Sequence, residues 1–274
     1  MSGPVIGVFD SGFGGLTVLR ALVERLPQAE FVFLGDTARL PYGSKSQRTI
    51  ARYAAESARF LVERQGAKSL VIACNTASAL ALDAIEAAVP VPVIGVIEPG
   101  AEAAAGQTKT GDVMVMATEA TVASHAYAAA CQRRGLHGIE KACPLLVPLV
   151  EEGWTDHAVT EQVVRIYLDE MLAEARAAGQ QPDALVLGCT NYPLLRPVLE
   201  RTVPPGVTVI DSAEATAQRV AIAMAGQAES RAAEAAGMPR IRCFATDSVA
   251  KFERLGSRFL GRPVGTVELI DLGG

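Results

Sequence analysis

Short apolar runs alternate with longer amphipathic runs along almost the whole chain, and this alternation restricts the possible folds more than any other feature. The short runs are rich in Val, Ile, Leu and Phe and end in Gly, Asp, Cys or Asn. Near-continuous apolar runs are typical of buried parallel strands, and the longer runs carry apolar residues at helical spacing. We predict strands at residues 5–9, 31–34, 70–73, 93–97, 113–116, 184–187, 207–210 and 240–244. We predict helices at residues 16–25, 46–65, 77–87, 121–134, 160–178 and 213–226.

Strands that alternate with helices in this way indicate an α/β fold of doubly wound parallel sheet, covered by helices on both faces. In such sheets, ligands bind beyond the carboxyl ends of the strands. The residues that directly follow each predicted strand are therefore the first candidates for a functional site. The Ala-rich, charged segment 225–237 lies outside this pattern, and we expect an exposed helical extension or loop there.

Composition argues against several classes of function. The 274 residues are half hydrophobic, which is enough for one large or two modest domains with a sizeable core. A formal charge of −5 argues against broad nucleic-acid binding, which relies on Lys and Arg. The chain start lacks the basic region of a secretory signal, and Asp83, Pro90 and Pro92 interrupt the most hydrophobic region. We therefore expect a cytoplasmic protein that binds neither nucleic acid nor membrane.

Two predicted strand ends have matching sequences, and each contains a cysteine. Residues 70–76 are LVIACNT and residues 185–191 are LVLGCTN, which suggests a duplicated half with Cys74 in one copy and Cys189 in the other. A thiol between a strand end and a helix start experiences the helix dipole, which lowers its pKa toward neutrality and suits it to proton transfer. Racemisation needs two such groups, because one removes a proton from one face of a carbon while the other delivers a proton to the opposite face.

The remaining cysteines, Cys131, Cys143 and Cys243, are expected to be structural thiols. Five cysteines without a CxxC pair are poor material for a disulfide framework. No histidine accompanies Cys74 and Cys189 at ligand spacing, so we expect no metal site.

The segment DSGFGG at residues 10–15 follows the first predicted strand and opens a helix. Its glycines allow the main chain to approach a ligand, and free N–H groups at a helix start suit an anion. The spacing of these glycines does not fit G-x-G-x-x-G, and the chain has no P-loop, so a small carboxylate fits better than a dinucleotide. The alternative is a tight turn in which Asp10 caps the helix.

Several small polar side chains stand next to the strand ends, where they could hold a substrate carboxylate without a fixed positive charge. They are Ser11, Asn75, Thr76, Thr121 and Thr190. Thr118 or Thr121 could equally cap the following helix. Of the neighbouring carboxylates Glu151 and Glu152, one could face the site and orient an ammonium group or a thiol.

Six motifs occur in the order found in one known family. They are FDSGFGGLTV at 9–18, GDT at 35–37, PYG at 41–43, ACNTAS at 73–78, PLVE at 148–151 and LGCT at 187–190. On these motifs the chain resembles the glutamate racemase family over nearly its whole length. The resemblance implies two pseudosymmetric doubly wound parallel-sheet domains with the active site between them, formed by residues 1–97 with 208–274 and by residues 98–207. It also implies a homodimeric racemase that needs no cofactor and converts L-glutamate to D-glutamate for peptidoglycan synthesis.

The resemblance also implies roles for individual residues. Cys74 would deprotonate D-glutamate and Cys189 L-glutamate; Asp10 would support Cys74, and Glu151 would be a further catalytic group unless Glu152 takes its place. With the residues noted above, the candidate substrate-binding set is Asp10, Ser11, Tyr42, Gly43, Asn75, Thr76, Thr121, Thr190 and Asn191.

One position departs from the family pattern. The family usually has histidine after the second Cys-Thr pair, where it is thought to assist the second thiol, and this chain has Asn191. An amide can hydrogen-bond but cannot relay a proton near neutral pH. Three further functions stay open: a racemase of aspartate or another amino acid, a decarboxylase of the same fold, which needs one cysteine, and a carboxylate sensor or partner-binding protein, which needs neither thiol.

Overall fold

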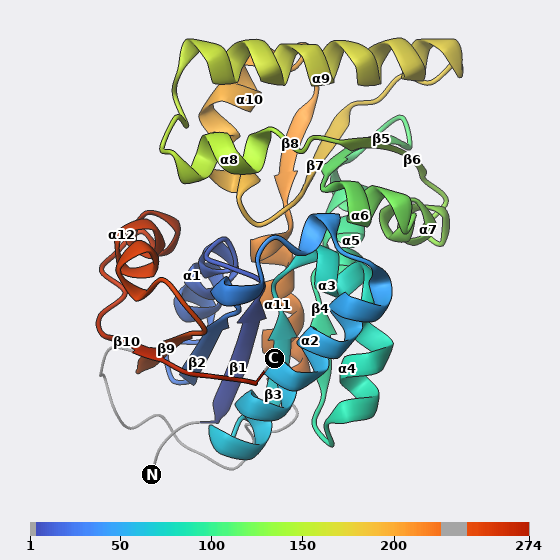
Figure 1. The fold of residues 1–274 in the computed structure, drawn as a ribbon. Coiled ribbons are helices and arrows are strands. Elements are labelled where there is room, and N and C mark those ends of the chain that lie inside the picture. The colour runs from blue at the N-terminus through green and yellow to red at the C-terminus, as the bar shows by residue number, and fades with distance from the viewer. Residues whose placement is uncertain (1–3, 226–239, 274) are drawn as a thin grey trace.

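Two parallel β-sheets form the framework of the molecule, one in the lower and one in the upper half of Figure 1. The structure is a computed structural model that describes residues 4–225 and 240–273. The extension predicted at 225–237 therefore lies, from residue 226 on, outside the described residues. The first sheet has the order β10-β9-β2-β1-β3-β4, and the second has the order β6-β5-β7-β8. The strands are β1 Val5–Asp10, β2 Glu30–Gly35, β3 Ser69–Ile72, β4 Val93–Gly95, β5 Asp112–Ala117, β6 His137–Ala142, β7 Ala184–Gly188, β8 Thr208–Asp211, β9 Ile241–Ala245 and β10 Val267–Leu269.

The two sheets share one connection pattern. The parallel order β2-β1-β3-β4 of the first sheet recurs as β6-β5-β7-β8 in the second. In each sheet the strand order therefore reverses beside its first strand, which is where parallel sheets bind ligands. Cys74 follows β3 and Cys189 follows β7, so the two cysteines occupy equivalent places. The predicted α/β class, with two related parallel sheets, is confirmed.

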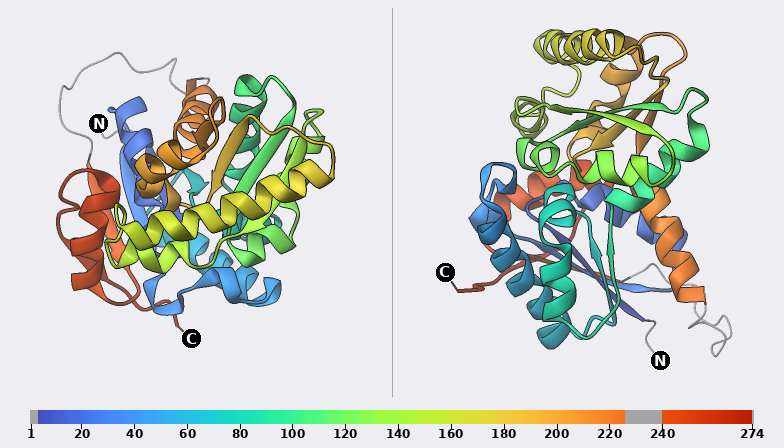
Figure 2. Two further views of the ribbon diagram at one scale, coloured as in Figure 1. Left: turned by 90° about the horizontal axis from the view of Figure 1, so that it is seen from above. Right: turned by 90° about the vertical axis from the view of Figure 1, so that its right-hand side faces the viewer.

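Helices cover both faces of each sheet, as Figures 1 and 2 show. One apolar cluster joins α1 and α12 on the first sheet to α8, α9 and α10 on the second. Separate clusters lie between the first sheet and α2 with α4, and between the second sheet and α5 with α7. The α-helices are α1 Leu16–Arg25, α2 Gln47–Arg59, α3 Asn75–Leu80, α4 Leu82–Ala88, α5 Ile97–Gln107, α6 Glu119–Ala123, α7 Ala126–Gln132, α8 Leu146–Glu151, α9 Ala158–Ala177, α10 Arg196–Thr202, α11 Ser212–Ala225 and α12 Val249–Leu260. Shorter helical turns are Thr37–Arg39, Tyr42–Ser44, Phe60–Arg64 and Tyr192–Leu195.

The elements that the sequence does not predict lie mostly at sheet edges or in short helices. Strands β6 and β10 are edge strands, and β6 has only one fully buried residue, Ile139. An edge strand is half solvated and lacks the continuous apolar run that identifies a central strand. Helix α5 begins at Ile97, the last residue of the predicted strand 93–97. The sequence pattern does not predict this helix, because Pro99 and Gly100 stand in its first turn, where proline is nevertheless tolerated. The predicted helix 121–134 is broken at His125, whose φ is 54°.

The chain passes between the two sheets twice. Helix α5 leads into the second sheet, α11 leads back toward the first, and the two helices pack against each other. Strand β8 pairs with β7, so the second sheet extends to Asp211. The division into two domains itself stays a prediction. Among the described residues, no helix combines the length and apolar character needed to cross a membrane.

Candidate active site

The site forms where the loop after β1 meets the loops after β3 and β7. Asp10 is the last residue of β1, and its Oδ1 atom accepts a hydrogen bond of 3.3 Å from the Thr190 hydroxyl. A Cβ atom added to Gly14 would lie 2.3 Å from Oδ1 of Asn191 and 2.4 Å from Oγ1 of Thr190. Only glycine permits this close approach, so the glycine-rich segment after β1 and the segment after Cys189 are in direct contact.

Cys74 is the N-cap residue of α3 and is buried. Its Sγ atom lies 3.3 Å from the Ser11 hydroxyl, to which it donates, and 3.4 Å from the Ala77 main-chain nitrogen, from which it accepts. Burial, followed by the nearby Asp10 carboxylate, raises the pKa of Cys74 to about 11. The hydrogen bonds at the helix start act in the lowering direction but are outweighed. The predicted lowering of this pKa is therefore wrong, because burial removes water from the thiolate.

Cys189 is buried at the equivalent position after β7. It precedes a turn and the short helix Tyr192–Leu195, so the predicted α-helix start at this thiol is also wrong. Burial is the largest cause that raises the pKa of Cys189; Cys74, Asp10 and Glu151 add to it, and the main-chain N–H of Asn191 opposes it. The two thiols and the two carboxylates thus affect one another electrostatically, as groups around one small site do.

Asp10 does not cap α1. The N-cap residue of α1 is Gly15, and Oδ2 of Asp10 instead accepts a hydrogen bond of 2.9 Å from the Gly12 main chain. Burial raises the pKa of Asp10, against the hydrogen bonds from Gly12, Gly15 and Thr190. The interpretation of Asp10 as a helix cap is therefore wrong, and the carboxyl group lies between the two cysteine loops.

Asp36 holds the loop with Tyr42 and Gly43 in place by hydrogen bonds. The Tyr42 hydroxyl donates to Oδ2 of Asp36 at 2.5 Å, and Asp36 also accepts from Arg39 at 2.8 Å and from Thr246 at 2.9 Å. A Cβ atom on Gly43 would lie 2.9 Å from Cβ of Thr118, so this loop also contacts the second sheet's α6. Because its hydroxyl is engaged, Tyr42 would hydrogen-bond a substrate through its main chain.

A polar edge formed by Asn75 and three threonines completes the site. The Oγ1 atoms of Thr76, Thr118 and Thr121 lie 2.9 to 3.3 Å from one another. Thr118 accepts from the Thr121 main chain and caps α6, so the capping role is confirmed for Thr118. Thr121 is fully buried behind Thr76. Within the described residues, the buried Nδ2 atom of Asn75 has no hydrogen-bond partner, which leaves a donor for a ligand.

Glu151, rather than Glu152, is turned toward the site. The Glu151 carboxylate raises the pKa of both Asp10 and Cys189, whereas Glu152 is an exposed residue. Lys251 of α12 lies 2.8 Å from Oε2 of Glu151 and 5.5 Å from the centre of the Phe13 ring. The sequence offers no signal for Lys251, because a single lysine in an unpredicted helix is usually a solvated surface residue.

The cysteines of the described residues form no disulfide bond. All five cysteines are free and buried, which confirms the predicted free thiols. In residues 4–225 and 240–273, no group of three His, Cys, Asp or Glu side chains could hold a metal ion.

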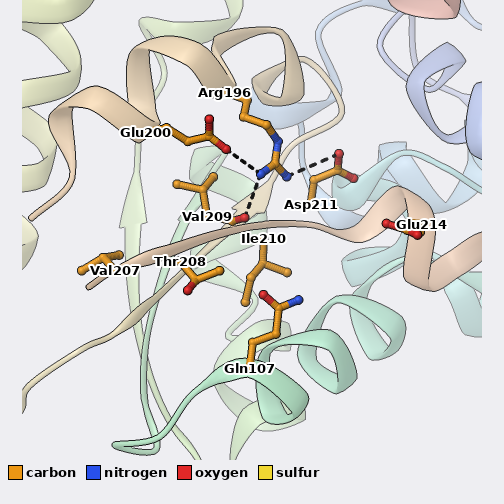
Figure 3. A pocket seen from close by; sticks show the side chains of 9 residues that line it. All are labelled: Gln107, Arg196, Glu200, Val207, Thr208, Val209, Ile210, Asp211 and Glu214. Atoms are coloured by element: carbon orange, nitrogen blue, oxygen red, sulfur yellow. Dashed lines mark hydrogen bonds and ion pairs between the residues drawn. The ribbon is translucent and has the colours of Figure 1, made fainter. Parts of the chain in front are cut away.

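A cavity of about 690 Å³ lies elsewhere, along β8. It is lined by residues 207–211 with Gln107, Arg196, Glu200 and Glu214. Arg196 crosses it, bound to Glu200 at 3.1 Å and to the Val209 carbonyl at 2.9 Å, with Asp211 3.9 Å away (Figure 3). The cavity contains none of the predicted site residues and no thiol, so it is not part of the cysteine site.

The arrangement of two thiols, one from each sheet, suits a reaction that moves protons on and off one carbon. The sequence profile described as Asp/Glu/Hydantoin racemase matches residues 6–220. A glutamate racemase of Koribacter versatilis (strain Ellin345) is 57% identical over 290 residues, with 99% of this chain and 98% of the relative covered.

Two solved structures are similar over the whole chain. Glutamate racemase isoform RacE1 from Bacillus anthracis is 37% identical, with a TM-score of 0.88 and 99% of each chain covered. Glutamate racemase from Francisella tularensis subsp. tularensis SCHU S4, solved in complex with D-glutamate, is 33% identical, with a TM-score of 0.87 and 99% of each chain covered.

Proposed function

This chain belongs to the Asp/Glu/Hydantoin racemase family, and we propose that it interconverts L-glutamate and D-glutamate with Cys74 and Cys189 as the two acid/base groups. The observation that carries the proposal is the equivalence of the two cysteines. Each follows the third strand of the shared order, β3 or β7. The segment after β1 contacts both loops, because Thr190 donates to Asp10 and Cys74 donates to Ser11. Glutamate is favoured as substrate by the identity of 57% to a glutamate racemase and by the similar structure that holds D-glutamate.

The proposed reaction exchanges one proton for another at the α-carbon. From D-glutamate, the Cys74 thiolate takes the α-proton, and the Cys189 thiol gives its proton to the opposite face. Cys74 is then a thiol and Cys189 a thiolate, which is the state that runs the reverse reaction. No proton is gained or lost overall, so the proposal needs no cofactor.

The raised pKa values of both thiols have two opposing effects on this chemistry. They make the thiolate rare in the unliganded protein, but they also make it a stronger base toward a carbon-bound proton. The ammonium group of a bound amino acid places a positive charge next to the thiols, which favours the thiolate. Substrate binding would therefore help to generate the reactive form.

The polar groups around the thiols would bind the two carboxylates. Nδ2 of Asn75 and the hydroxyls of Ser11 and Thr76 are donors, and the main chain at residues 42–43 is close by. The Thr190 hydroxyl donates to Asp10, so it would reach the substrate only by giving up that bond. Thr121 would act through its hydrogen bond to Thr76. Asp10 would support Cys74, and Glu151 would support Cys189 from the other side. Asn191 would contribute a neutral amide beside Cys189.

The test measures the loss of optical activity of L-glutamate and of D-glutamate, without added cofactor, in deuterated buffer. We expect racemisation with deuterium at the α-carbon, and a loss of at least about a hundredfold in kcat for Cys74→Ser and for Cys189→Ser, since each removes an essential acid/base group. Cys243→Ser, a buried thiol outside the site, is the matched control and should keep its activity. Turnover of aspartate instead of glutamate would change the substrate but keep the mechanism.

A decarboxylase and a carboxylate sensor would each give a different result in the same experiment. A decarboxylase would release carbon dioxide and would survive the loss of one cysteine. A sensor would bind glutamate with both cysteines replaced by serine and would show no turnover with either present. We further propose that the protein acts in the cytoplasm as a homodimer and supplies D-glutamate for peptidoglycan; size measurement in solution and depletion of the protein in cells would test these points.

A further inference from the structure

Tyr127 of α7 contacts a chain neighbour of each thiol. Its side chain is fully buried, and its hydroxyl donates a hydrogen bond of 2.7 Å to Oδ1 of Asn75, the residue after Cys74. A Cβ atom on Gly188, the residue before Cys189, would lie 3.1 Å from the Tyr127 ring. One side chain therefore contacts the cysteine loop of each sheet.

The Tyr127 hydroxyl decides which way the Asn75 amide faces. A hydroxyl can donate and accept, but the Ser212 side chain also hydrogen-bonds to the Tyr127 oxygen, which directs the Tyr127 proton to Oδ1 of Asn75. An amide side chain has an acceptor oxygen and a donor nitrogen of similar shape, and only its hydrogen bonds distinguish the two orientations. With Oδ1 held by Tyr127, Nδ2 must point away from α7. This nitrogen is buried and has no partner among the described residues. A buried donor without a partner is costly, so it indicates a place for an acceptor that belongs to a ligand.

We propose that Tyr127 is a positioning residue for the racemase reaction: it fixes the Asn75 amide so that Nδ2 donates to a carboxylate oxygen of the amino-acid substrate. The inference rests on the proposed function for the identity of that substrate. Without the Tyr127 hydroxyl, the amide can turn over and present Oδ1 to the carboxylate, where two acceptors repel each other. The effect falls on substrate binding, because Asn75 does not transfer the proton.

The substitution Tyr127→Phe removes the hydroxyl and keeps the ring against Gly188. We expect the KM for both enantiomers to rise about tenfold, the cost of one hydrogen bond to a charged group, with kcat changed less than about threefold. In an Asn75→Ala background, Tyr127→Phe should produce no further rise in KM, because the amide that it positions is gone. A purely structural role would lower thermal stability and leave the KM unchanged.

Tyr192→Phe is the matched control. Tyr192 is also fully buried, and its hydroxyl donates to the Cys143 carbonyl at 2.9 Å rather than to Asn75. We expect Tyr192→Phe to lower the melting temperature and to keep the wild-type KM. An unchanged KM in Tyr127→Phe, or a further rise in KM in the Asn75→Ala background, would overturn the inference.

A binding measurement separates this inference from the proposed function. If the wild-type protein binds D-glutamate by calorimetry but does not racemise it, the proposed function fails, and a tenfold weaker Kd in Tyr127→Phe still supports the positioning role. If Tyr127→Phe then binds as tightly as wild type, the positioning role fails too. Wild-type protein that neither binds nor converts glutamate would overturn both.

Discussion

The Thr190 hydroxyl donates a hydrogen bond of 3.3 Å to the Asp10 carboxylate, which joins the loop of Cys189 to the group that lies beside Cys74. Asp10 is the second cause, after burial, of the raised pKa of Cys74. Burial also raises the pKa of Asp10 itself, and the Thr190 hydrogen bond opposes that rise. One hydroxyl thus influences the carboxyl group shared by the two halves of the site.

Replacing Thr190 by valine should therefore slow the reaction in both directions. The substitution keeps the shape of the side chain but removes the donor, so the pKa of Asp10 rises and the loop contact is lost. We expect kcat to fall about tenfold for L-glutamate and for D-glutamate, about the value of one buried hydrogen bond to a carboxylate.

Initial rates of circular dichroism change at saturating substrate measure this effect. Thr216→Val is the control, because Thr216 is fully buried and its hydroxyl bonds within α11 to the Ser212 carbonyl at 2.6 Å. If the two variants lose the same fraction of kcat, the Thr190–Asp10 contact has no special role.

The sequence predicts the central strands and both cysteine loops, because these depend on local patterns. Continuous apolar strands and the repeated Cys motifs can be read directly, whereas β6 cannot, since its sequence HGIEKA has one buried residue and no apolar run. The pKa directions of Cys74 and Cys189 could not be predicted either. The helix start at Cys74 is visible in the sequence, but the burial that raises the pKa of both thiols depends on loops from both sheets.

The ion pair between Glu151 and Lys251 is another feature of the site that the sequence could not predict. The two residues are 100 positions apart and meet through the packing of α8 and α12. Nothing near Lys251 in the chain indicates its partner. The Asn75 contact with Tyr127 spans 52 positions, and it depends on the break at His125 that starts α7.

The substitution Asn191→His should alter the two directions of the reaction unequally. Histidine can relay a proton near neutral pH and the amide cannot, so proton removal by Cys189 from L-glutamate should gain more than the reverse step. Because two enantiomers have equal free energy in water, kcat/KM must stay equal in the two directions. We therefore expect the kcat from L to D to rise more than the kcat from D to L. The KM for L-glutamate should then rise relative to the KM for D-glutamate by the same factor.

Progress curves from each enantiomer measure both constants of this variant. Asn191→Gln, which keeps an amide, is the control and should show no gain in either direction. An unchanged ratio of the two kcat values in Asn191→His would contradict a proton-transfer role for this position.

Alkaline pH should destabilise the protein in part through its buried thiols. Burial raises the pKa of Cys243 from 9.0 to about 12. The folded protein then retains a proton that the unfolded chain loses. This stabilisation is fully present below pH 9 and is lost as the pH rises toward about 12. The melting temperature of Cys243→Ala should therefore fall less than that of wild type between about pH 8 and about pH 10.5.

Differential scanning calorimetry at the two pH values measures this difference. Ser57→Ala truncates another fully buried side chain but removes no titratable group, so it should show the full wild-type fall. Equal falls in wild type and Cys243→Ala would show that this thiol has the same pKa in the folded and unfolded states.

Gly14→Ala should abolish activity, and Gly12→Ala should not, although both lie in one loop. The added methyl at Gly14 would lie 2.3 Å from the Asn191 side chain and 2.4 Å from Thr190, and both lie in the short segment after Cys189. The methyl at Gly12 would lie 3.0 Å from Cδ2 of Leu40, the end of a side chain that can turn aside. Since the methyl at Gly14 must push the segment after β1 away from the Cys189 loop, the reacting groups lose their alignment. We expect kcat/KM to fall at least about a hundredfold in Gly14→Ala and less than about fivefold in Gly12→Ala. If Gly14→Ala keeps a wild-type kcat/KM while folded by circular dichroism, the contact between the two loops is not needed for the reaction.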